Sequence, residues 1–219
     1  RIAITGANGF LGKNLFFNLI LNNKDQIFKI TRNTKKKEIE NILKNIDIIF
    51  HLAAVNRATK SKTFKNDNVK FTKYICEFLE KNKLKPLIVF SSTTQVNKNN
   101  EYGYSKKECE KILRNFSKKN ESQVAILRLP NIFGKWSKPN YNSVVSTFCY
   151  NISRKKKIKI SDPKKFINLI YIDDCIDIFI DIKNNFKEKF KIYKNFKNIK
   201  KINLKELAKI IFQFELMRK

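Results

Sequence analysis

Cysteine and histidine are scarce in this 219-residue chain, which has four cysteines and one histidine. No two cysteines have the C-x-x-C spacing of a zinc site, and their wide separation argues against a disulfide framework. We therefore expect reduced, isolated thiols at Cys76, Cys109, Cys149 and Cys175. The single histidine, His51, cannot build a metal site by itself, so we expect it in a core or surface position and predict no metal.

Long apolar runs are also missing. The longest, at residues 86–90 and 169–172, fall far below the roughly 20 residues that cross a bilayer. The opening residues do not have the pattern of a signal peptide. These absences predict a soluble, cytoplasmic protein without membrane insertion.

Acidic residues are few, since 19 aspartates and glutamates face 47 lysines and arginines for a formal net charge of +28. Only seven of the basic residues are arginine, and the lysines are spread over the whole chain. Base readout and phosphate clamps favour the planar arginine fork, whereas scattered lysines are typical of a solvated surface. We therefore predict no nucleic-acid partner, and we expect the positive field to help gather an anionic small substrate at low salt.

Apolar strands and helical periodicity alternate along the first 130 residues, and 42% hydrophobic residues suffice for a full core. Strands are expected at residues 1–5, 26–31, 47–52, 86–91 and 123–128. Helices are expected at about 11–21, 35–44, 68–81 and 102–118. This alternation predicts an α/β fold with a doubly wound parallel sheet of the Rossmann type and right-handed crossovers.

The regular alternation of strands and helices stops after Arg128, where prolines and glycine mark an irregular segment. Beyond it we expect a helix at 142–154, a strand at 157–160, a strand at 190–193 and an amphipathic helix from 203 or 204 to 214. A strand at 167–172 and a helix at 173–183 are expected to return the chain to the core. We predict a cofactor-binding core of residues 1–134 and a small substrate-binding lobe of residues 135–219.

Three glycines, Gly6, Gly9 and Gly12, follow the first strand and open the first helix. This spacing lets the backbone approach a pyrophosphate, whose charge is held by N–H groups and the helix N-terminus. A tight turn without a ligand is the alternative. Folds specific for NAD usually place an acid after the second strand, whereas this chain has Thr31 and Arg32 there, followed by lysines. A cation favours a 2′-phosphate, so NADP(H) is the predicted cofactor, with solvated surface charge as the alternative.

Tyr102 and Lys106 are four residues apart on an expected helix and therefore share one face. Because a nearby ammonium favours tyrosinate, we expect Lys106 to lower the pKa of Tyr102, so that the phenol transfers a proton near neutral pH. Thr93, at the carboxyl end of the preceding strand, can hydrogen-bond the same substrate oxygen. Tyr104 has Glu108 as its i+4 neighbour and points to another side of the helix, so we assign it no role.

Six motifs occur in the order and spacing of one known family. They are residues 5–12 (TGANGFLG), 47–54 (DIIFHLAA), 68–72 (NVKFT), 91–93 (SST), Tyr102 with Lys106, and 128–134 (RLPNIFG). By these motifs the chain resembles the extended short-chain dehydrogenase/reductases of the NAD-dependent epimerase/dehydratase family, which act on nucleotide sugars. The resemblance implies a catalytic trio of Thr93, Tyr102 and Lys106, and a homodimer formed through the helices of Tyr102 and Asn68.

The same resemblance implies a set of binding residues. Cofactor contacts are expected from Gly6, Asn8, Gly9, Phe10, Leu11, Gly12, Arg32, Leu52, Ala53, Ala54, Asn68, Ser91, Tyr102, Lys106 and Pro130. Substrate contacts are expected from Thr93, Asn131, Asn142 and Ser143. Within these sets, Ala53 and Ala54 would line the adenosine path, Asn68 would support the surroundings of the lysine, Pro130 would abut the nicotinamide, and Asn131 would face the nucleotide sugar.

A narrower resemblance runs through residues 51–57 (HLAAVNR), 133–144 (FGKWSKPNYNSV) and 147–150 (TFCY). These segments are similar to the reductase domain of the bifunctional capsular polysaccharide enzymes of UDP-N-acetyl-L-fucosamine synthesis. The similarity implies NADPH-dependent reduction of the C4 keto group of a UDP-2-acetamido-2,6-dideoxyhexulose. Those enzymes carry C3 epimerisation in a zinc-bearing cupin domain, and the 219 residues contain no such domain, so epimerisation at C3 is not assigned.

Several alternatives stay open. A 4-epimerase that retains NAD uses the same trio, and only Arg32 and the narrower resemblance speak against it. A dehydratase needs an acid and a base after the threonine, but Thr94 and Gln95 stand there, so this activity is disfavoured. A non-catalytic dinucleotide-binding module would bind NADPH without reducing a keto-sugar. If the lysines instead bind nucleic acid, the affinity would fall steeply as salt is added.

Four more residues are open between a binding and a structural role. For Trp136 and Tyr141 the two alternatives are stacking on a uridine and burial in the lobe. Arg57 and Arg154 are able to bind a diphosphate or to remain solvated.

Overall fold

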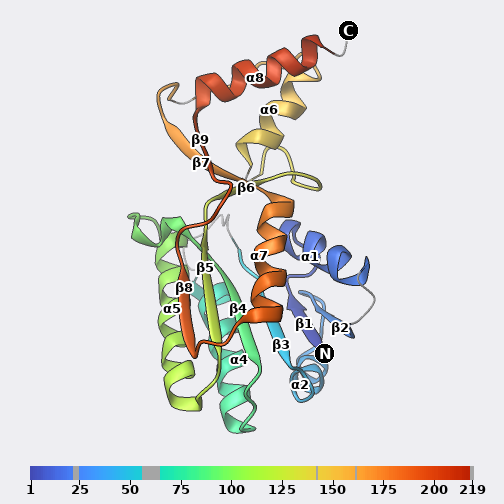
Figure 1. Cartoon of the computed structure of the whole chain (residues 1–219), viewed down its shortest axis with the longest axis vertical. Helices are drawn as coiled ribbons and strands as arrows, with labels where there is room; N and C mark the ends of the chain where they lie inside the picture. Colours follow the sequence, from blue (N-terminus) through green and yellow to red (C-terminus); the bar gives the residue numbers. More distant parts are fainter. Residues whose placement is uncertain (22–24, 56–64, 142, 161, 218–219) are drawn as a thin grey trace. The chain divides into compact units, whose positions relative to one another are not determined.

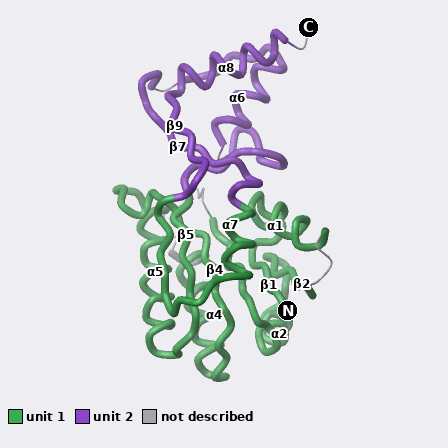
Figure 2. The backbone as a smooth tube through the Cα atoms, in the orientation of Figure 1, with its two compact units in different colours: residues 1–129, 176–195 green, residues 130–175, 196–219 purple. Residues whose placement is uncertain are grey.

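The computed structural model describes residues 1–21, 25–55, 65–141, 143–160 and 162–217. The chain forms two compact units (Figure 2), and each is built from two stretches of sequence. Unit 1 contains residues 1–129 and 176–195, and unit 2 contains residues 130–175 and 196–219. The two units are not separated by a single boundary after residue 134, because the chain returns to unit 1 at Ile176. The division of function between residues 1–134 and 135–219 stays a prediction.

Within the described residues, unit 1 has a six-stranded sheet in the order β2-β1-β3-β4-β5-β8, and all neighbouring strands are parallel (Figure 1). The strands are β1 (Ile2–Thr5), β2 (Ile27–Ile30), β3 (Ile48–His51), β4 (Leu87–Thr93), β5 (Val124–Leu129) and β8 (Phe190–Tyr193). The order reverses at β1, which has β2 on one side and β3 on the other. Ligands bind at such a switch point in doubly wound sheets, and the predicted α/β fold is confirmed.

Helices cover both faces of this sheet, which explains why β1 and β4 are buried along their whole length. One face packs against α2 (Lys36–Leu43), α4 (Lys70–Lys81) and α5 (Glu101–Asn120). On the other face the ring of Phe50 in β3 meets Phe179 of α7 (Ile172–Asn185), with 5.8 Å between ring centroids. The helix α1 (Phe10–Leu21) connects β1 to β2 and contacts both strands.

Helix α5 contains two of the candidate catalytic residues, Tyr102 and Lys106. Its N-terminus is capped by Asn100, whose side-chain oxygen accepts a hydrogen bond of 2.8 Å from the Gly103 N–H. A short 3₁₀ turn, η2 (Thr94–Asn97), lies between β4 and this cap. A Cβ on Gly103 would collide with the carbonyl oxygen of Gln95, so glycine lets the first turn of α5 lie against η2.

Unit 2 holds a three-stranded sheet in the order β6-β7-β9. It is formed by β6 (Asn131–Phe133), β7 (Phe166–Tyr171) and β9 (Lys200–Asn203). Two helices, α6 (Val144–Ile152) and α8 (Leu204–Leu216), pack their buried apolar residues with Leu169 of β7 into one cluster. Ser143 and Asn203 cap these helices with their side-chain oxygens.

The sequence predictions for this half were partly wrong. The strand expected at 167–172 forms as β7 but pairs with β6 and β9 instead of returning to the core sheet, and β8 takes the place beside β5. Its exposed residues Phe166, Asn168 and Tyr171 suit a sheet covered on one side. The strand expected at 157–160 is not formed, although Ile158 and Ile160 pack on the core of unit 2.

The other expected elements occur with small shifts at their ends. The helix expected from Asn68 begins as a π-helical turn, η1 (Lys65–Val69), and continues as α4. No helix in the described ranges is both long and apolar enough for a membrane crossing.

Candidate active site

The glycine turn after β1 is tight on one side and open on the other. Gly6 has φ +68°, in the left-handed region, and a Cβ there would lie 2.8 Å from the backbone N of Ala53. A Cβ on Gly12 would collide with the carbonyl oxygen of Gly6. A Cβ on Gly9, by contrast, would meet only Gly6 O, at 3.1 Å, among the described atoms within 4 Å. Gly6 and Gly12 are therefore needed for packing, and Gly9 leaves the turn accessible.

The glycine turn leads directly into α1, and the first N–H groups of a helix have no partner inside the helix. Asn8 and Gly9 are exposed, Phe10 and Leu11 are half-buried, and no acidic residue lies in the first turn. Backbone N–H groups and the positive end of a helix suit a pyrophosphate. The turn therefore fits the diphosphate of a dinucleotide.

Arg32 lies in the turn after β2, beside the glycine turn, because β2 pairs with β1 up to Thr5 and Ile30. The turn is held by Thr31, whose N–H donates to Thr34 Oγ1 at 2.9 Å. The Arg32 side chain is exposed, and it has no ion pair within the described part of the chain. Contact of Arg32 with a ribose phosphate stays a prediction.

The segment after β3 forms hydrogen bonds with Thr5 of β1 and with Asn68. The N–H groups of Leu52 and Ala53 donate to Thr5 Oγ1 at 3.1 and 3.0 Å. Asn68, which is 3% exposed, accepts from the Val55 N–H at 2.8 Å and donates to Val55 O and Ser105 Oγ. Both amide hydrogens of Asn68 are thus used inside the protein. Its position beside Ser105 supports the α5 segment that contains the lysine, and direct contact with a cofactor stays a prediction.

The proposed trio lies at the carboxyl end of β4 and the start of α5. Thr93 is buried and accepts from the Gln95 N–H at 3.2 Å. Lys106 is 2% exposed, donates from Nζ to the Ser91 carbonyl oxygen at 2.7 Å and lies 4.4 Å above the ring of Phe90. Because a lysine ammonium has three hydrogens, the Ser91 bond leaves donors for a ligand.

Tyr102 lies in the first turn of α5, one turn before Lys106. Tyr104 behaves differently, since its ring is 54% exposed and its hydroxyl donates to Asn99 Oδ1 at 2.7 Å. The two tyrosines therefore lie in different environments, as the sequence predicted.

The expected pKa of the tyrosine is wrong in direction. Burial, together with the nearby Cys109 thiol, raises the pKa of Tyr102 to about 12. Burial also lowers the pKa of Lys106 to about 8, an effect that the surrounding Cys109 and Glu110 partly offset. Loss of water around the phenol outweighs any help from the ammonium, so the phenol carries its proton at neutral pH.

A buried ion pair beside the trio was not anticipated from the sequence. Glu110, one turn after Lys106 on α5, binds Arg128 of β5 through Oε2, which lies 2.6 Å from the terminal guanidinium nitrogen. Ser92 donates to the same carboxylate at 2.5 Å. The pair fixes α5 to the ends of β4 and β5, where Thr93 and Ser91 lie. The repeat Tyr102, Lys106, Glu110 at four-residue spacing is the sequence signal for it.

The remaining predicted residues belong to unit 2. Pro130 precedes β6, and Asn131 donates to the Asn168 carbonyl oxygen at 3.1 Å. Ser143 is buried and caps α6 by accepting from the Ser146 N–H. Its hydroxyl therefore has a structural use, and substrate contact by these residues stays a prediction. Asn142 and Arg57 lie outside the described residues.

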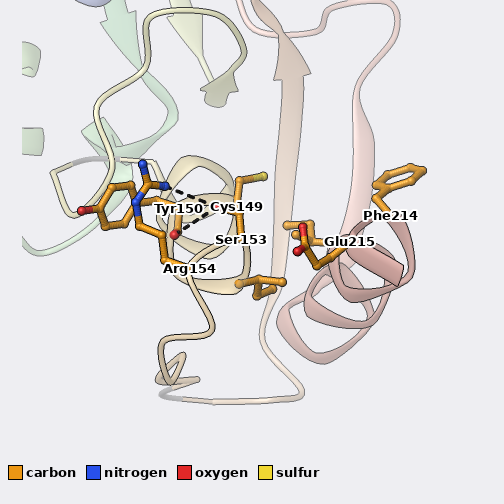
Figure 3. Close-up of a pocket in the computed structure, with 8 residues that line it drawn as sticks. Cys149, Tyr150, Ser153, Arg154, Phe214 and Glu215 are labelled. Carbon is orange, nitrogen blue, oxygen red and sulfur yellow. Dashed lines mark hydrogen bonds between the residues drawn. The ribbon is translucent and has the colours of Figure 1, made fainter. Parts of the chain in front are cut away.

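Trp136 and Tyr141 are 48% and 44% exposed, so they are not buried in the core of the lobe, and stacking on a uridine stays a prediction. Unit 2 also contains an open hollow of about 370 Å³ between α6 and α8 (Figure 3). Arg154 at this hollow stacks on the Tyr150 ring at 4.0 Å and donates to Ser153 Oγ at 3.4 Å. Glu215 lines the same hollow and opposes a diphosphate there.

No group of three or more His, Cys, Asp or Glu residues suited to a metal occurs among the residues that the structure describes. The thiols at Cys76, Cys109 and Cys175 are buried, and Cys149 is exposed. The described cysteines are not bonded to one another.

Comparisons with known proteins agree with this geometry. The model of the NAD dependent epimerase/dehydratase family matches residues 2–194. UDP-2-acetamido-2,6-beta-L-arabino-hexul-4-ose reductase from Pseudomonas aeruginosa is 36% identical over 219 residues, which is 100% of this chain and 59% of that protein. D-erythronate dehydrogenase from Haemophilus influenzae is 27% identical over 195 residues, 71% of this chain and 61% of that protein.

Solved structures are similar over nearly the whole chain. The capsular polysaccharide assembling protein CapF from Staphylococcus aureus has a TM-score of 0.86 at 36% identity, covering 99% of this chain and 58% of that one. UDP-glucose 4-epimerase from Thermotoga maritima has a TM-score of 0.87 at 18% identity, covering 100% and 83%, and this is a likeness of fold alone. The chain spans about three fifths of the length of the Pseudomonas reductase and of CapF.

Proposed function

This chain belongs to the NAD-dependent epimerase/dehydratase family, as its motifs indicated, and on that premise we propose that it is a nucleotide-sugar reductase. Its reaction is the NADPH-dependent reduction of the C4 keto group of a UDP-2-acetamido-2,6-dideoxyhexulose, in the synthesis of a capsule or surface polysaccharide precursor. The observation that carries the proposal is the 36% identity to the Pseudomonas reductase, which extends over all 219 residues.

The reaction adds two hydrogen atoms to a carbonyl group. When bound, the reduced nicotinamide supplies a hydride to the carbonyl carbon. The carbonyl oxygen, which becomes negative as the hydride arrives, takes a proton from Tyr102. One cofactor is oxidised and one ketone is reduced to an alcohol, and water restores the proton to the phenol.

The raised pKa of Tyr102 supports the reductive direction. A general acid must carry its proton before the reaction, and a phenol with a pKa of about 12 does so at neutral pH. Thr93 is the last residue of β4 and caps the η2 turn, and in this proposal its hydroxyl hydrogen-bonds the same oxygen. The 4-epimerase alternative has to begin by removing a proton, for which this environment is less suitable.

Lys106 positions the reacting groups. Its bond to Ser91 O fixes the ammonium at the end of β4, and its other hydrogens are directed to the ribose of the cofactor in this proposal. The Glu110–Arg128 pair keeps α5 on β4 and β5, so that Tyr102 and Thr93 keep their relative positions.

NADP(H) is proposed as the cofactor over NAD(H). The glycine turn and the N-terminus of α1 fit its diphosphate, and the exposed Arg32 provides a charge for the 2′-phosphate. Family resemblance further supports a homodimer through α4 and α5, and light scattering on the purified protein tests the dimer. A cytoplasmic location is proposed from the sequence pattern alone.

The test is an assay with the UDP-4-keto-sugar and either NADPH or NADH, following cofactor absorbance. We expect oxidation of NADPH that depends on the keto-sugar and a lower kcat/KM with NADH. Oxidation that is absent with both cofactors contradicts the proposed function. Purification with tightly retained NAD, together with interconversion of the C4 epimers, would instead identify a 4-epimerase.

A further inference from the structure

His51 ends β3 and is buried, with both ring nitrogens bonded to threonine hydroxyls. Its Nδ1 lies 2.8 Å from Thr5 Oγ1, and its Nε2 lies 2.9 Å from Thr72 Oγ1. In a neutral imidazole one nitrogen donates and the other accepts. The direction of the two bonds follows from the other partners of the hydroxyls.

Thr5 Oγ1 already accepts two hydrogen bonds, from the N–H groups of Leu52 and Ala53. A hydroxyl oxygen has two lone pairs and one hydrogen, so the contact with His51 uses the hydroxyl hydrogen. Nδ1 of His51 is therefore the acceptor, and the ring hydrogen is on Nε2.

The Nε2–H group then donates to Thr72, whose own hydroxyl donates to the Asn68 carbonyl oxygen at 2.8 Å. Thr72 Oγ1 also lies 3.3 Å from Cys109 Sγ, and its one hydrogen is used in the shorter bond to Asn68 O. A second ring hydrogen, on Nδ1, would face the oxygen of Thr5 when both its lone pairs are in use. Burial and the Lys106 ammonium act in the same direction and lower the pKa of His51 to about 3. Because the series ends on a carbonyl oxygen, it does not pass a proton toward Tyr102.

The backbone that Thr5 holds is in contact with the glycine turn. A Cβ on Gly6 would lie 2.8 Å from both N and Cα of Ala53, so a shift of Ala53 is transmitted to Gly6. If Thr5 rotates away from His51, the N–H groups of Leu52 and Ala53 lose their acceptor.

We propose that His51 is a positioning residue for the dinucleotide site, which acts as the neutral Nε2–H tautomer to orient Thr5 and thereby hold the Leu52–Ala53 backbone against Gly6. The inference rests on the proposed function in one respect, that a dinucleotide binds at this turn. It assigns a task to the one histidine of the chain, which the reaction itself does not use.

The first test reads the tautomer in the unaltered protein. His51 is the only histidine, so isotope-labelled histidine gives nitrogen NMR signals from a single ring. We expect a protonated Nε2 and an unprotonated Nδ1, with no titration between about pH 8 and about pH 5. A hydrogen on Nδ1, or titration in that range, overturns the proposal without any variant.

The second test separates the two bonds by substitution. Asparagine is able to place an oxygen where Nδ1 lies, and glutamine is able to place an N–H where Nε2 lies. His51→Asn therefore keeps the bond to Thr5, and His51→Gln keeps only the bond to Thr72. NADPH titration by fluorescence should show that the Gln variant binds about tenfold more weakly than the Asn variant, the equivalent of one net hydrogen bond.

A matched pair at Thr5 provides rescue by a conservative change. Thr5→Val keeps the shape of the side chain but removes the hydroxyl, whereas Thr5→Ser keeps the hydroxyl. We expect Thr5→Val to raise the KM for NADPH about tenfold with a smaller effect on kcat, and Thr5→Ser to restore it. Circular dichroism confirms that each variant is folded before it is compared.

The outcomes separate this proposal from the proposed function. If the unaltered protein binds NADPH and the two His51 variants bind it equally well, the positioning role is wrong and the reductase proposal is unaffected. If the unaltered protein binds NADPH but reduces no keto-sugar, the reductase proposal fails and the positioning role is still decided by the variants. If it binds no dinucleotide at all, both are wrong.

Discussion

Lys106 is a buried ammonium whose burial predicts a measurable dependence of stability on pH. Its Nζ donates to Ser91 O at 2.7 Å and lies over the Phe90 ring, and the side chain is almost fully buried. Burial lowers the pKa of Lys106 from 10.5 to about 8. The native protein therefore releases this proton at a lower pH than the unfolded chain does.

The sign and size of the effect follow from proton linkage. Below a pH of about 8 the lysine is charged in both states, and the full cost of burying the charge is present. Between about 8 and 10.5 the unfolded chain binds one more proton than the native protein, so the free energy of unfolding rises with pH. The difference in pKa corresponds to roughly 3 kcal/mol, of which about 2.5 kcal/mol is recovered between about pH 7 and about pH 10.

Lys106→Met removes the titrating group at similar volume. We expect the free energy of unfolding of the wild type, measured relative to this variant by urea denaturation, to rise by about 2.5 kcal/mol over that range. Taking the difference cancels the cysteines and tyrosines that do not interact with Lys106, whereas Cys109, whose pKa the ammonium lowers, contributes to the difference. Lys107→Met changes an exposed neighbour, keeps the buried ammonium and so should keep the wild-type pH dependence. Curves for wild type and Lys106→Met that run parallel from pH 7 to 10 would refute the reasoning.

Three further tests of the site use substitutions. Tyr102→Phe should lower kcat by about two to four orders of magnitude with little change in NADPH affinity, whereas Tyr104→Phe should keep full turnover; equal effects in the two variants would contradict the assignment. Glu110→Gln leaves a buried guanidinium without its carboxylate and should lower the free energy of unfolding by about 3 kcal/mol in urea denaturation, and an unchanged midpoint would show that the pair is unimportant. Gly9→Ala should fold and bind NADPH more weakly, while Gly12→Ala collides with the turn and should unfold, as thermal melting and titration will show; normal NADPH binding by Gly9→Ala would contradict the proposed diphosphate position.

The parallel sheet of unit 1 was predictable because inner strands such as β1 and β4 are buried on both faces and read as short apolar runs. The glycine turn was predictable for a different reason, since Gly6 and Gly12 have contacts that only glycine permits. The alternation of strands and helices predicted that the strands are parallel, and this placed Thr93 and Tyr102 at the same end of the sheet.

Unit 2 was harder to predict. Strand β9 begins with Lys200 and Lys201, which are exposed, so it gives no apolar signal, and β6 has three residues. The alternation of lysine and isoleucine at 157–160 resembles a strand, but this segment has no paired neighbour in the described sheet. Pairing depends on partners distant in sequence, and local periodicity does not reveal them.

The burial and the long-range contacts of the site residues also could not be predicted from the local sequence pattern. The i+4 spacing correctly put Tyr102 and Lys106 on one helix, but the direction of the tyrosine pKa depends on burial, which packing determines. The pair of Glu110 and Arg128 joins residues 18 positions apart on different elements, and the roles of the His51 nitrogens depend on hydroxyls from two other elements.

The most direct measurement is the product of one incubation of the purified protein with NADPH and UDP-2-acetamido-2,6-β-L-arabino-hexul-4-ose, the compound named for the Pseudomonas relative. Mass spectrometry and absorbance together should show that the sugar gains two hydrogen atoms and that one NADPH is oxidised for each molecule of alcohol formed. A sugar of unchanged mass, or NADPH that stays reduced in its presence, would contradict the assignment of a 4-keto-sugar reductase.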